Sequence, residues 1–340
     1  MLVTRGDGRA RRRGVHLTEL EQSPGAGARR SRERAKPRGA SRWLSALLFR
    51  RRLLTLWLLL TPPLLWLGVV YLGSLFAMLI QGAYSFDDFS MTVTSTLTLS
   101  NYRALLAGAN LDIILRTVGM AVAVTVGCAG LGFPIAYYIA RYTEGRKKGL
   151  FYVSVLLPMW ASYIVKAYAW TAILAQGGVV YWFLGKLGLR AALEGVLELP
   201  VVGGSSLSTS NLGRFLVFSY VWLPFMILPI YAAIERIPEN LLQAAADLGA
   251  RPGQMLRTVI LPLTFPGIVA GSIFTFSLTL GDYIIPQLVG PPGYYIGTMV
   301  NTQQGSVGNL PMAAAFTAVP LLIITVYLTL ARRLGAFDAL

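Results

Sequence analysis

The chain has 340 residues, of which 55% are hydrophobic and only 13% are charged, whereas a soluble domain carries about a quarter charged residues. Its mean hydropathy of +0.58 therefore indicates a protein whose main solvent is lipid. The one cysteine, Cys128, excludes an intrachain disulfide, and the one histidine, His16, lies outside the apolar runs. Zinc sites and Cys–His or Ser–His catalytic pairs thus lack their side chains in the apolar part of the chain.

The N-terminal segment 1–52 carries most of the net charge. It holds 15 Lys and Arg against four Asp and Glu, a net +11 of the +15 of the whole chain. Such a composition cannot offset the entropy of ordering, so we expect a disordered, basic cytoplasmic tail. A nucleic-acid arm or a contact with anionic lipid is the alternative. We expect the simpler role of a solvated tail that fixes topology, without a nucleic-acid partner.

Six long apolar segments follow this tail. Each reaches the length of about 20 apolar residues that a helix needs to cross a bilayer. A helix is the expected form because lipid offers the backbone no hydrogen-bond partners. The sequence therefore predicts an all-α integral membrane protein with a transmembrane domain over 53–335 and a C-terminal tail over 336–340. The predicted spans, or transmembrane helices, are 53–81, 113–141, 150–176, 215–235, 260–288 and 311–331.

Loop charge sets the expected orientation. The loop after the second span has four Lys and Arg and one Glu within 141–148, whereas 290–310 has no charge. The positive-inside rule then places both termini, 142–149 and 236–259 in the cytoplasm, and the other three loops outside. Six spans with both ends inside are self-consistent. The predicted location is the bacterial cytoplasmic (inner) membrane, with several passes through the lipid bilayer.

The segment 236–259 is predicted to form two short helices. Pro238 suits the first helical position, and Leu241 and Leu242 form an apolar side. Gly249 is placed to end the first helix in a left-handed cap, and a second short helix leads into the fifth span. Three consecutive alanines leave room for a close protein neighbour. A helix that contacts only lipid is the alternative, but such helices favour a basic polar face and large apolar anchors.

The run QAAADLGARPGQMLRTVILP, residues 243–262, resembles the cytoplasmic signature of binding-protein-dependent ABC importer permeases. That signature is Glu-Ala-Ala, three residues, Gly, nine residues and Ile-x-Leu-Pro. Gln243 stands where Glu is usual and so brings no charge, and Val259 replaces Ile. The resemblance implies a type I ABC importer permease fold whose segment 236–259 is a coupling-helix loop that binds an ATPase. The residues that it assigns to this contact are Gln243, Ala244, Ala245, Asp247, Gly249, Leu261 and Pro262.

Two further stretches, 157–170 and 278–300, resemble the first permease of spermidine/putrescine-type importers. The resemblance implies import of a polyamine by alternating access, and another small solute is the alternative. In that family the permease works with a homologous second permease, a dimer of ATP-binding subunits and an extracytoplasmic substrate-binding protein. The chain itself is expected to be no enzyme and to bind no cofactor, because it has no G-x4-GK-[ST] phosphate loop and ATP would be used by its partner.

Polar side chains inside the spans are candidates for the translocation path. Those of the fifth span share one helix face, and Tyr163, Lys166 and Trp170 share a face of the third. An aspartate beside aromatic rings suits a polyammonium ion, through charge pairing and cation–π contact. The alternative is that Asp282 and Lys166 neutralise each other or only pack. The candidates are Ser272, Thr275, Thr279, Asp282, Tyr283, Tyr163 and Trp170.

Two rival function classes fit the sequence less well. A proton-coupled secondary transporter would show an internal repeat and more carboxylates at the middle of the membrane, whereas Asp282 is the only acidic residue in the interior of a predicted span. A membrane-embedded enzyme would need clustered His, Cys or paired carboxylates, and the predicted spans have none of these.

Overall fold

The computed structural model describes residues 52–333. The chain divides into two units, Met1–Trp66 and Leu67–Leu340, and each is described by itself. Apart from Arg52, the predicted N-terminal tail lies outside the described residues, as does the predicted C-terminal tail 336–340.

The described part of the first unit is one apolar helix, α2 (Arg52–Leu65), followed by the first residue of a π-helical turn, η1 (Trp66–Leu72). Pro62 and Pro63 lie inside α2 and remove two backbone N–H donors from it. The large side chains from Leu56 to Trp66 are exposed in the isolated chain. A helix that is apolar all round belongs in lipid or against another apolar surface.

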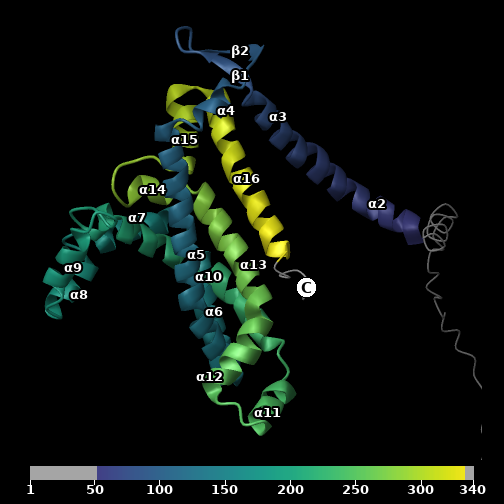
Figure 1. The fold of residues 1–340 in the computed structure, drawn as a ribbon, viewed down its shortest axis with the longest axis vertical. Coiled ribbons are helices and arrows are strands. Elements are labelled where there is room, and N and C mark those ends of the chain that lie inside the picture. The colour runs from purple at the N-terminus through teal and green to yellow at the C-terminus, as the bar shows by residue number, and fades with distance from the viewer. Residues whose placement is uncertain (1–51, 334–340) are drawn as a thin grey trace, which may run out of the picture. The chain divides into compact units, whose positions relative to one another are not determined.

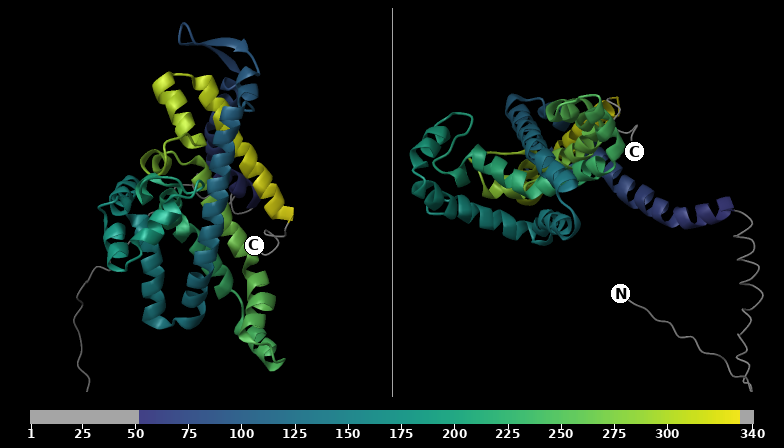
Figure 2. Two further views of the ribbon diagram at one scale, coloured as in Figure 1. Left: turned by 60° about the vertical axis from the view of Figure 1, so that its left-hand side comes forward. Right: turned by 90° about the horizontal axis from the view of Figure 1, so that it is seen from below.

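Three long helices form the centre of the second unit. α5 (Gly108–Tyr142), α10 (Asn211–Glu235) and α13 (Leu261–Gly281) pack against one another and lie side by side (Figure 1, Figure 2). α10 and α13 approach closely because Gly267 and Gly271 place no side chain between them. A Cβ built on Gly271 would lie 3.0 Å from the Cα of Met226. Glycines four residues apart are a common device for packing helices in lipid.

A second layer packs on this centre. α3 (Gly73–Gln81) contacts α16 (Leu310–Arg333). The hydroxyl of Tyr102, in the short helix α4 (Ser100–Ala104), donates to the Leu79 carbonyl at 2.7 Å. α15 (Ile296–Thr302) and η4 (Gln303–Val307) precede α16, so the predicted loop 289–310 is in large part helical.

The predicted loop 82–112 contains a hairpin that the sequence analysis did not predict. β1 (Tyr84–Asp87) and β2 (Thr92–Leu97) pair in antiparallel fashion. The Asp87 carboxylate accepts the Phe89 N–H at 3.0 Å and the Ser90 hydroxyl at 2.8 Å. These two bonds hold the turn and lower the pKa of Asp87, because they favour its ionised form.

The third predicted span, 150–176, is wrong as a single straight helix. α6 (Gly145–Trp160) is followed by α7 (Tyr163–Leu174) and α8 (Val179–Lys186), and the helical segment Tyr163–Lys186 meets α6 at 95°. The backbone is extended at Ala161, after Pro158 in the last turn of α6. α9 (Arg190–Leu197) and η2 (Leu207–Thr209) then lead to α10.

The fifth predicted span, 260–288, is also wrong as a continuous helix. α13 ends at Gly281, Asp282 has an extended backbone (φ −75°, ψ 135°), and a separate short helix, α14 (Ile284–Leu288), follows. Before α13 come α11 (Glu239–Asp247), α12 (Pro252–Met255) and the π-helical turn η3 (Leu256–Ile260). The two short helices that the sequence predicts in 236–259 are thus confirmed.

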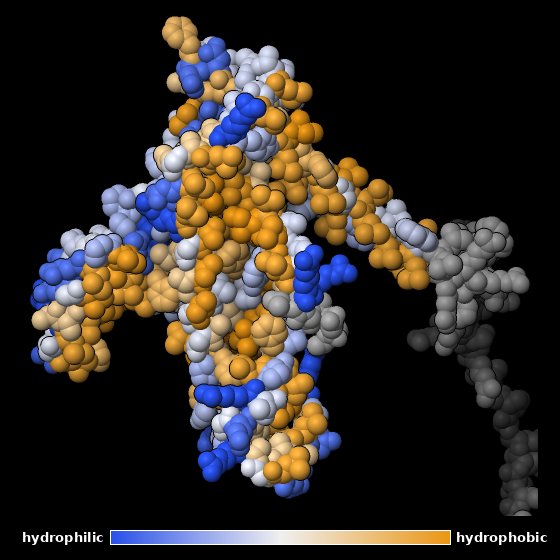
Figure 3. Space-filling view, in the orientation of Figure 1, coloured by the Kyte–Doolittle hydropathy of each residue, from blue (hydrophilic) through white to orange (hydrophobic). Residues whose placement is uncertain are grey.

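Within residues 52–333, five helices are long and apolar enough to cross a membrane, and the bent pair gives a sixth if it counts as one span. In the second unit, apolar residues cover much of the helix surface seen in Figure 3, and hydrophilic and apolar residues are mixed at the end where α11 lies. This distribution is that of an all-α membrane protein.

Candidate coupling segment and translocation path

The coupling segment, residues 236–259, begins its first helix one residue later than predicted. Pro238 is the N-cap of α11, with an extended backbone (φ −69°, ψ 142°), and Glu239 is the first helical residue. The Pro238 carbonyl accepts the Leu241 N–H at 3.2 Å. The ring of proline fixes only φ, so the residue fits the cap and the first helical position equally well.

Gly249 ends α11 in the left-handed conformation that the sequence predicts. Its φ is +80°, and its N–H donates to the Ala246 carbonyl at 2.8 Å. The next N–H, of Ala250, donates to the Ala245 carbonyl at 3.0 Å. This pair of bonds is a Schellman motif. No atom lies within 4 Å of a Cβ built on Gly249, so only the backbone conformation requires glycine here.

The coupling segment is open to a neighbour over most of its length. No residue from Pro238 to Val259 is buried, and Leu248 is 90% exposed. An apolar side chain presented on a short helix in this way is typical of helix-in-groove recognition. Six of the seven residues assigned to the ATPase contact are exposed, and Ala245 is half-buried: Gln243, Ala244, Asp247, Gly249, Leu261 and Pro262 form the exposed set.

A cavity of about 320 Å³ lies where α7, α10 and the break after α13 meet. Tyr163, at the first position of α7, donates its hydroxyl to one carboxylate oxygen of Asp282. The other oxygen accepts the Ile284 N–H at 2.9 Å. The helix break therefore brings the carboxylate of Asp282 and the backbone N–H of Ile284 together. The residues that line the cavity are Tyr163, Trp222, Ser277, Leu278, Gly281, Asp282, Tyr283 and Ile284.

Trp222 of α10 also lines this cavity, and it was not among the residues predicted from the sequence. Its ring stacks on that of Tyr163, with centroids 5.7 Å apart and planes 20° from parallel. Its Nε1 is buried and has no hydrogen-bond partner in the described part of the chain. One carboxylate surrounded by Tyr163, Trp222 and Tyr283 offers a cation both charge pairing and ring faces.

The other predicted path residues do not line this cavity. Ser272, Thr275 and Thr279 are buried, and each hydroxyl donates to a carbonyl of its own helix at 2.7–3.0 Å. Trp170 packs on Tyr220, with ring centroids 5.0 Å apart. The predicted helix face does not extend to Asp282, because α13 ends one residue before it.

Lys166 is held by the bend between α6 and α7. Its amino group donates to the Pro158 carbonyl at 2.9 Å, one of the last four carbonyls of α6, which have no partner within that helix. Within residues 52–333 no ion pair joins it to Asp282. Lys166 thus caps a helix end rather than neutralising Asp282.

Arg214 is a second residue that sequence reasoning missed. It is 1% exposed and lies 4.4 Å above the Tyr295 ring. The predicted fourth span began at Phe215 and so left Arg214 out, although an ionisable group inside an apolar helix is a signal in itself. The hydrogen bonds of Arg214 join α10 to residues 286–295, which follow Asp282 in the chain. The acceptors are the carbonyls of Pro286, Val289 and Pro291, the Asn211 side chain and the Tyr295 hydroxyl.

Solved structures share this fold. A bacterial ABC transporter involved in the import of the acidic polysaccharide alginate matches 86% of this chain and 99% of its own, with a TM-score of 0.60 at 20% identity. The bacterial alginate ABC transporter in complex with an alginate pentasaccharide-bound periplasmic protein matches 83% of this chain and 96% of its own, with a TM-score of 0.63 at 17% identity. These likenesses confirm the predicted type I ABC importer permease fold.

Relatives by sequence are closer. The inner membrane ABC transporter permease protein YdcU of Escherichia coli (strain K12) is 66% identical over 287 residues, 84% of this chain and 92% of that protein. The spermidine/putrescine transport system permease protein PotB of the same strain is 30% identical over 248 residues, 73% of this chain and 86% of that protein. The family model described as binding-protein-dependent transport system inner membrane component matches residues 132–336. The chain therefore belongs to this family of multi-pass inner membrane permeases of ABC importers.

Proposed function

We propose that this permease forms half of the translocation path for a polyamine such as spermidine or putrescine. The observation that supports it is the cavity of Asp282, Tyr163, Trp222 and Tyr283. A carboxylate is attractive to an ammonium group, and ring faces add cation–π contact. PotB and PotC of Escherichia coli, both named as spermidine/putrescine permeases, are 30% and 32% identical to parts of this chain.

The proposed mechanism is alternating access driven from outside the chain. A dimer of ATP-binding subunits binds the coupling segment and, on closing, moves it as a rigid body. That motion reorients the helices that carry Tyr163, Trp222 and Asp282. The path then opens towards an extracytoplasmic substrate-binding protein, with both termini of the permease in the cytoplasm.

The remaining partners follow from the same proposal. Two homologous permeases form the path, and PotB and PotC, both similar to this chain, suggest that the second permease is a different chain. ATP is hydrolysed by the ATP-binding subunits, so this chain contributes no catalytic residue and no cofactor site.

The test is uptake of radiolabelled spermidine by the complete complex in proteoliposomes, with ATP hydrolysis followed in parallel. We expect Asp282→Asn to reduce uptake about five-fold. A unit charge pair at about 4 Å is worth about 4 kcal/mol at an effective dielectric of about 20 before desolvation, and a quarter of that gives this factor. Lys166→Met should not reduce uptake through lost substrate contact, because Lys166 binds the Pro158 carbonyl.

Asp88→Asn is the matched control, because it removes an exposed carboxylate from the turn between β1 and β2. Unchanged uptake in Asp282→Asn would remove this residue from the site. If no polyamine stimulates ATP hydrolysis with the cognate binding protein present, the solute is another small molecule and the polyamine proposal is dropped.

A further inference from the structure

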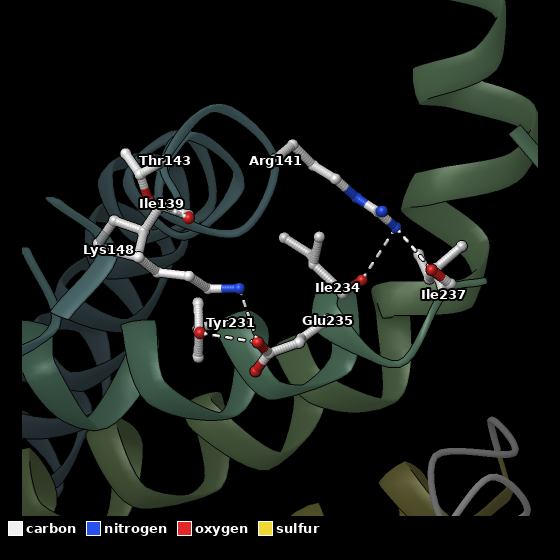
Figure 4. Close-up of polar contacts among 8 residues, drawn as sticks. All are labelled: Ile139, Arg141, Thr143, Lys148, Tyr231, Ile234, Glu235 and Ile237. Atoms are coloured by element: carbon white, nitrogen blue, oxygen red, sulfur yellow. Dashed lines mark hydrogen bonds and ion pairs between the residues drawn. The ribbon is translucent and has the colours of Figure 1, made fainter. Parts of the chain in front are cut away.

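Polar contacts join the ends of α5, α6 and α10 at the start of the coupling segment (Figure 4). Arg141, in the last turn of α5, donates from Nη2 to the carbonyls of Ile234 at 3.1 Å and Ile237 at 2.9 Å. Lys148, in the first turn of α6, donates to a Glu235 carboxylate oxygen at 2.7 Å. We call Arg141, Lys148, Glu235 and Ile237 the basal clamp.

The place of these contacts follows from how α10 ends. Its last carbonyls have no N–H donor four residues further on, and a cation near a helix C-terminus is favourable. Arg141 donates to one of these carbonyls, that of Ile234, and places a positive charge at this C-terminus. The Ile237 carbonyl belongs to the residue just before Pro238, the N-cap of α11. The guanidinium of Arg141 is therefore bound to the backbone where α10 passes into the first helix of the coupling segment.

A second contact fixes α6 to the same end of α10. The Tyr231 hydroxyl donates to the same Glu235 oxygen at 3.0 Å, and the Lys148 ammonium lies 5.6 Å from the centre of the Tyr231 ring. The side chains of Lys148 and Glu235 are 30% and 49% exposed. An ion pair this exposed adds little to the stability of the fold, but it links the start of α6 to the end of α10.

We propose that the basal clamp passes the movement of the coupling segment to the hairpin of α5 and α6 and, through it, to the cavity. This inference rests on the proposed function of the coupling segment as the ATPase contact. Arg141 and Lys148 lie on either side of the short turn between α5 and α6. Arg141 contacts Ile237 and Lys148 contacts Glu235, so a displacement of this end of α10 moves both helices. α6 then leads through the 95° bend to Tyr163, whose hydroxyl is bound to Asp282.

The basic residues of segment 141–148 fall into two groups. Arg146 and Lys147 are exposed and are available to fix topology by the positive-inside rule. Arg141 and Lys148 have specific partners on α10, the Ile234 carbonyl and the Glu235 carboxylate, which topology alone does not require. Arg141 and Lys148 are positioning residues, and Lys147 is a matched control because it carries the same charge one residue away.

The experiment compares transport with ATP hydrolysis in the complete complex in proteoliposomes, with radiolabelled spermidine as the probe. We expect Arg141→Gln and Lys148→Gln to keep ATP hydrolysis but to lower the number of solute molecules imported per ATP by about five-fold or more, the lower range of coupling between sites. Lys147→Gln should keep this ratio within about two-fold, as surface substitutions do. The exchanged pair Lys148→Glu with Glu235→Lys should restore most of the ratio.

A second measurement does not depend on the solute. Spin labels at Arg146→Cys and Ala246→Cys, in a Cys128→Ala background, report the distance between the start of α6 and α11. With the clamp intact this distance should stay constant when ATP-bound closure is trapped, and in Lys148→Gln it should change. A change of several ångströms with the clamp intact, or an unaltered ratio in both Arg141→Gln and Lys148→Gln, overturns the proposal.

The two proposals fail in different ways. If Gly249→Val leaves both uptake and ATP hydrolysis unaffected, the coupling segment does not contact the ATPase and the proposed function itself is wrong. If Gly249→Val abolishes uptake while the clamp variants behave like Lys147→Gln, only the clamp is wrong.

Discussion

At the scale of single residues, the end of α11 depends on the left-handed backbone conformation of Gly249. Its φ of +80° closes the Schellman motif that turns the chain from α11 towards α12. A β-branched residue in this region costs about 1–2 kcal/mol, so Gly249→Val is expected to straighten or shift the end of α11. We expect membrane insertion to stay intact, uptake to be abolished and the ATPase to be uncoupled or released. Uptake, ATP hydrolysis and co-purification of the ATP-binding subunits in the reconstituted complex measure the loss of uptake, the uncoupling and the release. The amount of the variant recovered in the membrane fraction measures insertion.

Two controls separate conformation from bulk at this residue. Asn tolerates a left-handed backbone, so Gly249→Asn should keep most of the uptake although its side chain is about as large as that of valine. Gly253 lies in α12, and no atom lies within 4 Å of a Cβ built on it, so Gly253→Ala should be neutral. Normal uptake by Gly249→Val would contradict the assignment of α11 as the coupling helix.

At the scale of elements, hydropathy predicts where helices lie but not where they break. The segments 150–176 and 260–288 are each apolar enough overall to be predicted as one span, yet the first bends by 95° and the second stops at Gly281. Each break carries a side-chain contact that a hydropathy pattern does not contain: the Lys166 amino group binds the Pro158 carbonyl at the first, and Tyr163 binds Asp282 at the second.

The residues of the candidate site that could be predicted are those marked by a local sequence pattern. The Gly249 cap follows from sequence because a helix end needs a residue that accepts positive φ. Asp282 and Tyr163 were found because polar groups in apolar spans are rare. Trp222 was not, since a tryptophan in an apolar helix is compatible with plain packing, and only the stacking on Tyr163 brings it into the cavity.

The contact between α10 and α13 gives a prediction at the same scale. A Cβ on Gly271 would lie 2.8 Å from the Met226 sulfur and 3.0 Å from its carbonyl oxygen. Gly271→Leu should therefore force the two helices apart and lower the free energy of unfolding by about 1–3 kcal/mol, as overpacking does. Thermal unfolding of the purified protein in detergent measures the change.

Gly130→Leu is the matched control for that substitution. Gly130 is exposed on α5, and no atom lies within 4 Å of a Cβ built on it. The same side chain there should leave the unfolding temperature nearly unchanged. Equal effects of the two substitutions would mean that added bulk, and not the contact between α10 and α13, determines the loss.

At the scale of the whole molecule, the bent pair decides how many times the chain crosses the membrane. If Gly145–Trp160 and Tyr163–Lys186 together form one span, the described part of the chain has six; if they re-enter on the same side, it has five. The charge along the chain favours six, because the basic segment 141–148 lies at the start of the pair, whereas the uncharged Gly- and Ser-rich run near residue 205 lies after it. Six spans place residues 147 and 201 on opposite sides of the membrane, whereas five spans place them on the same side.

Cysteine labelling with a membrane-impermeant maleimide distinguishes them. In a Cys128→Ala background, which removes the only native thiol, single cysteines replace Asp88, Lys147, Val201 and Ala246, all exposed in the structure. With six spans and cytoplasmic termini, intact spheroplasts should label residues 88 and 201, and inside-out vesicles should label 147 and 246. Labelling of 147 and 201 from the same side would establish a re-entrant pair and five spans. Labelling of 246 from the outside would reverse the orientation of the coupling segment, and an ATPase in the cytoplasm could not then bind α11.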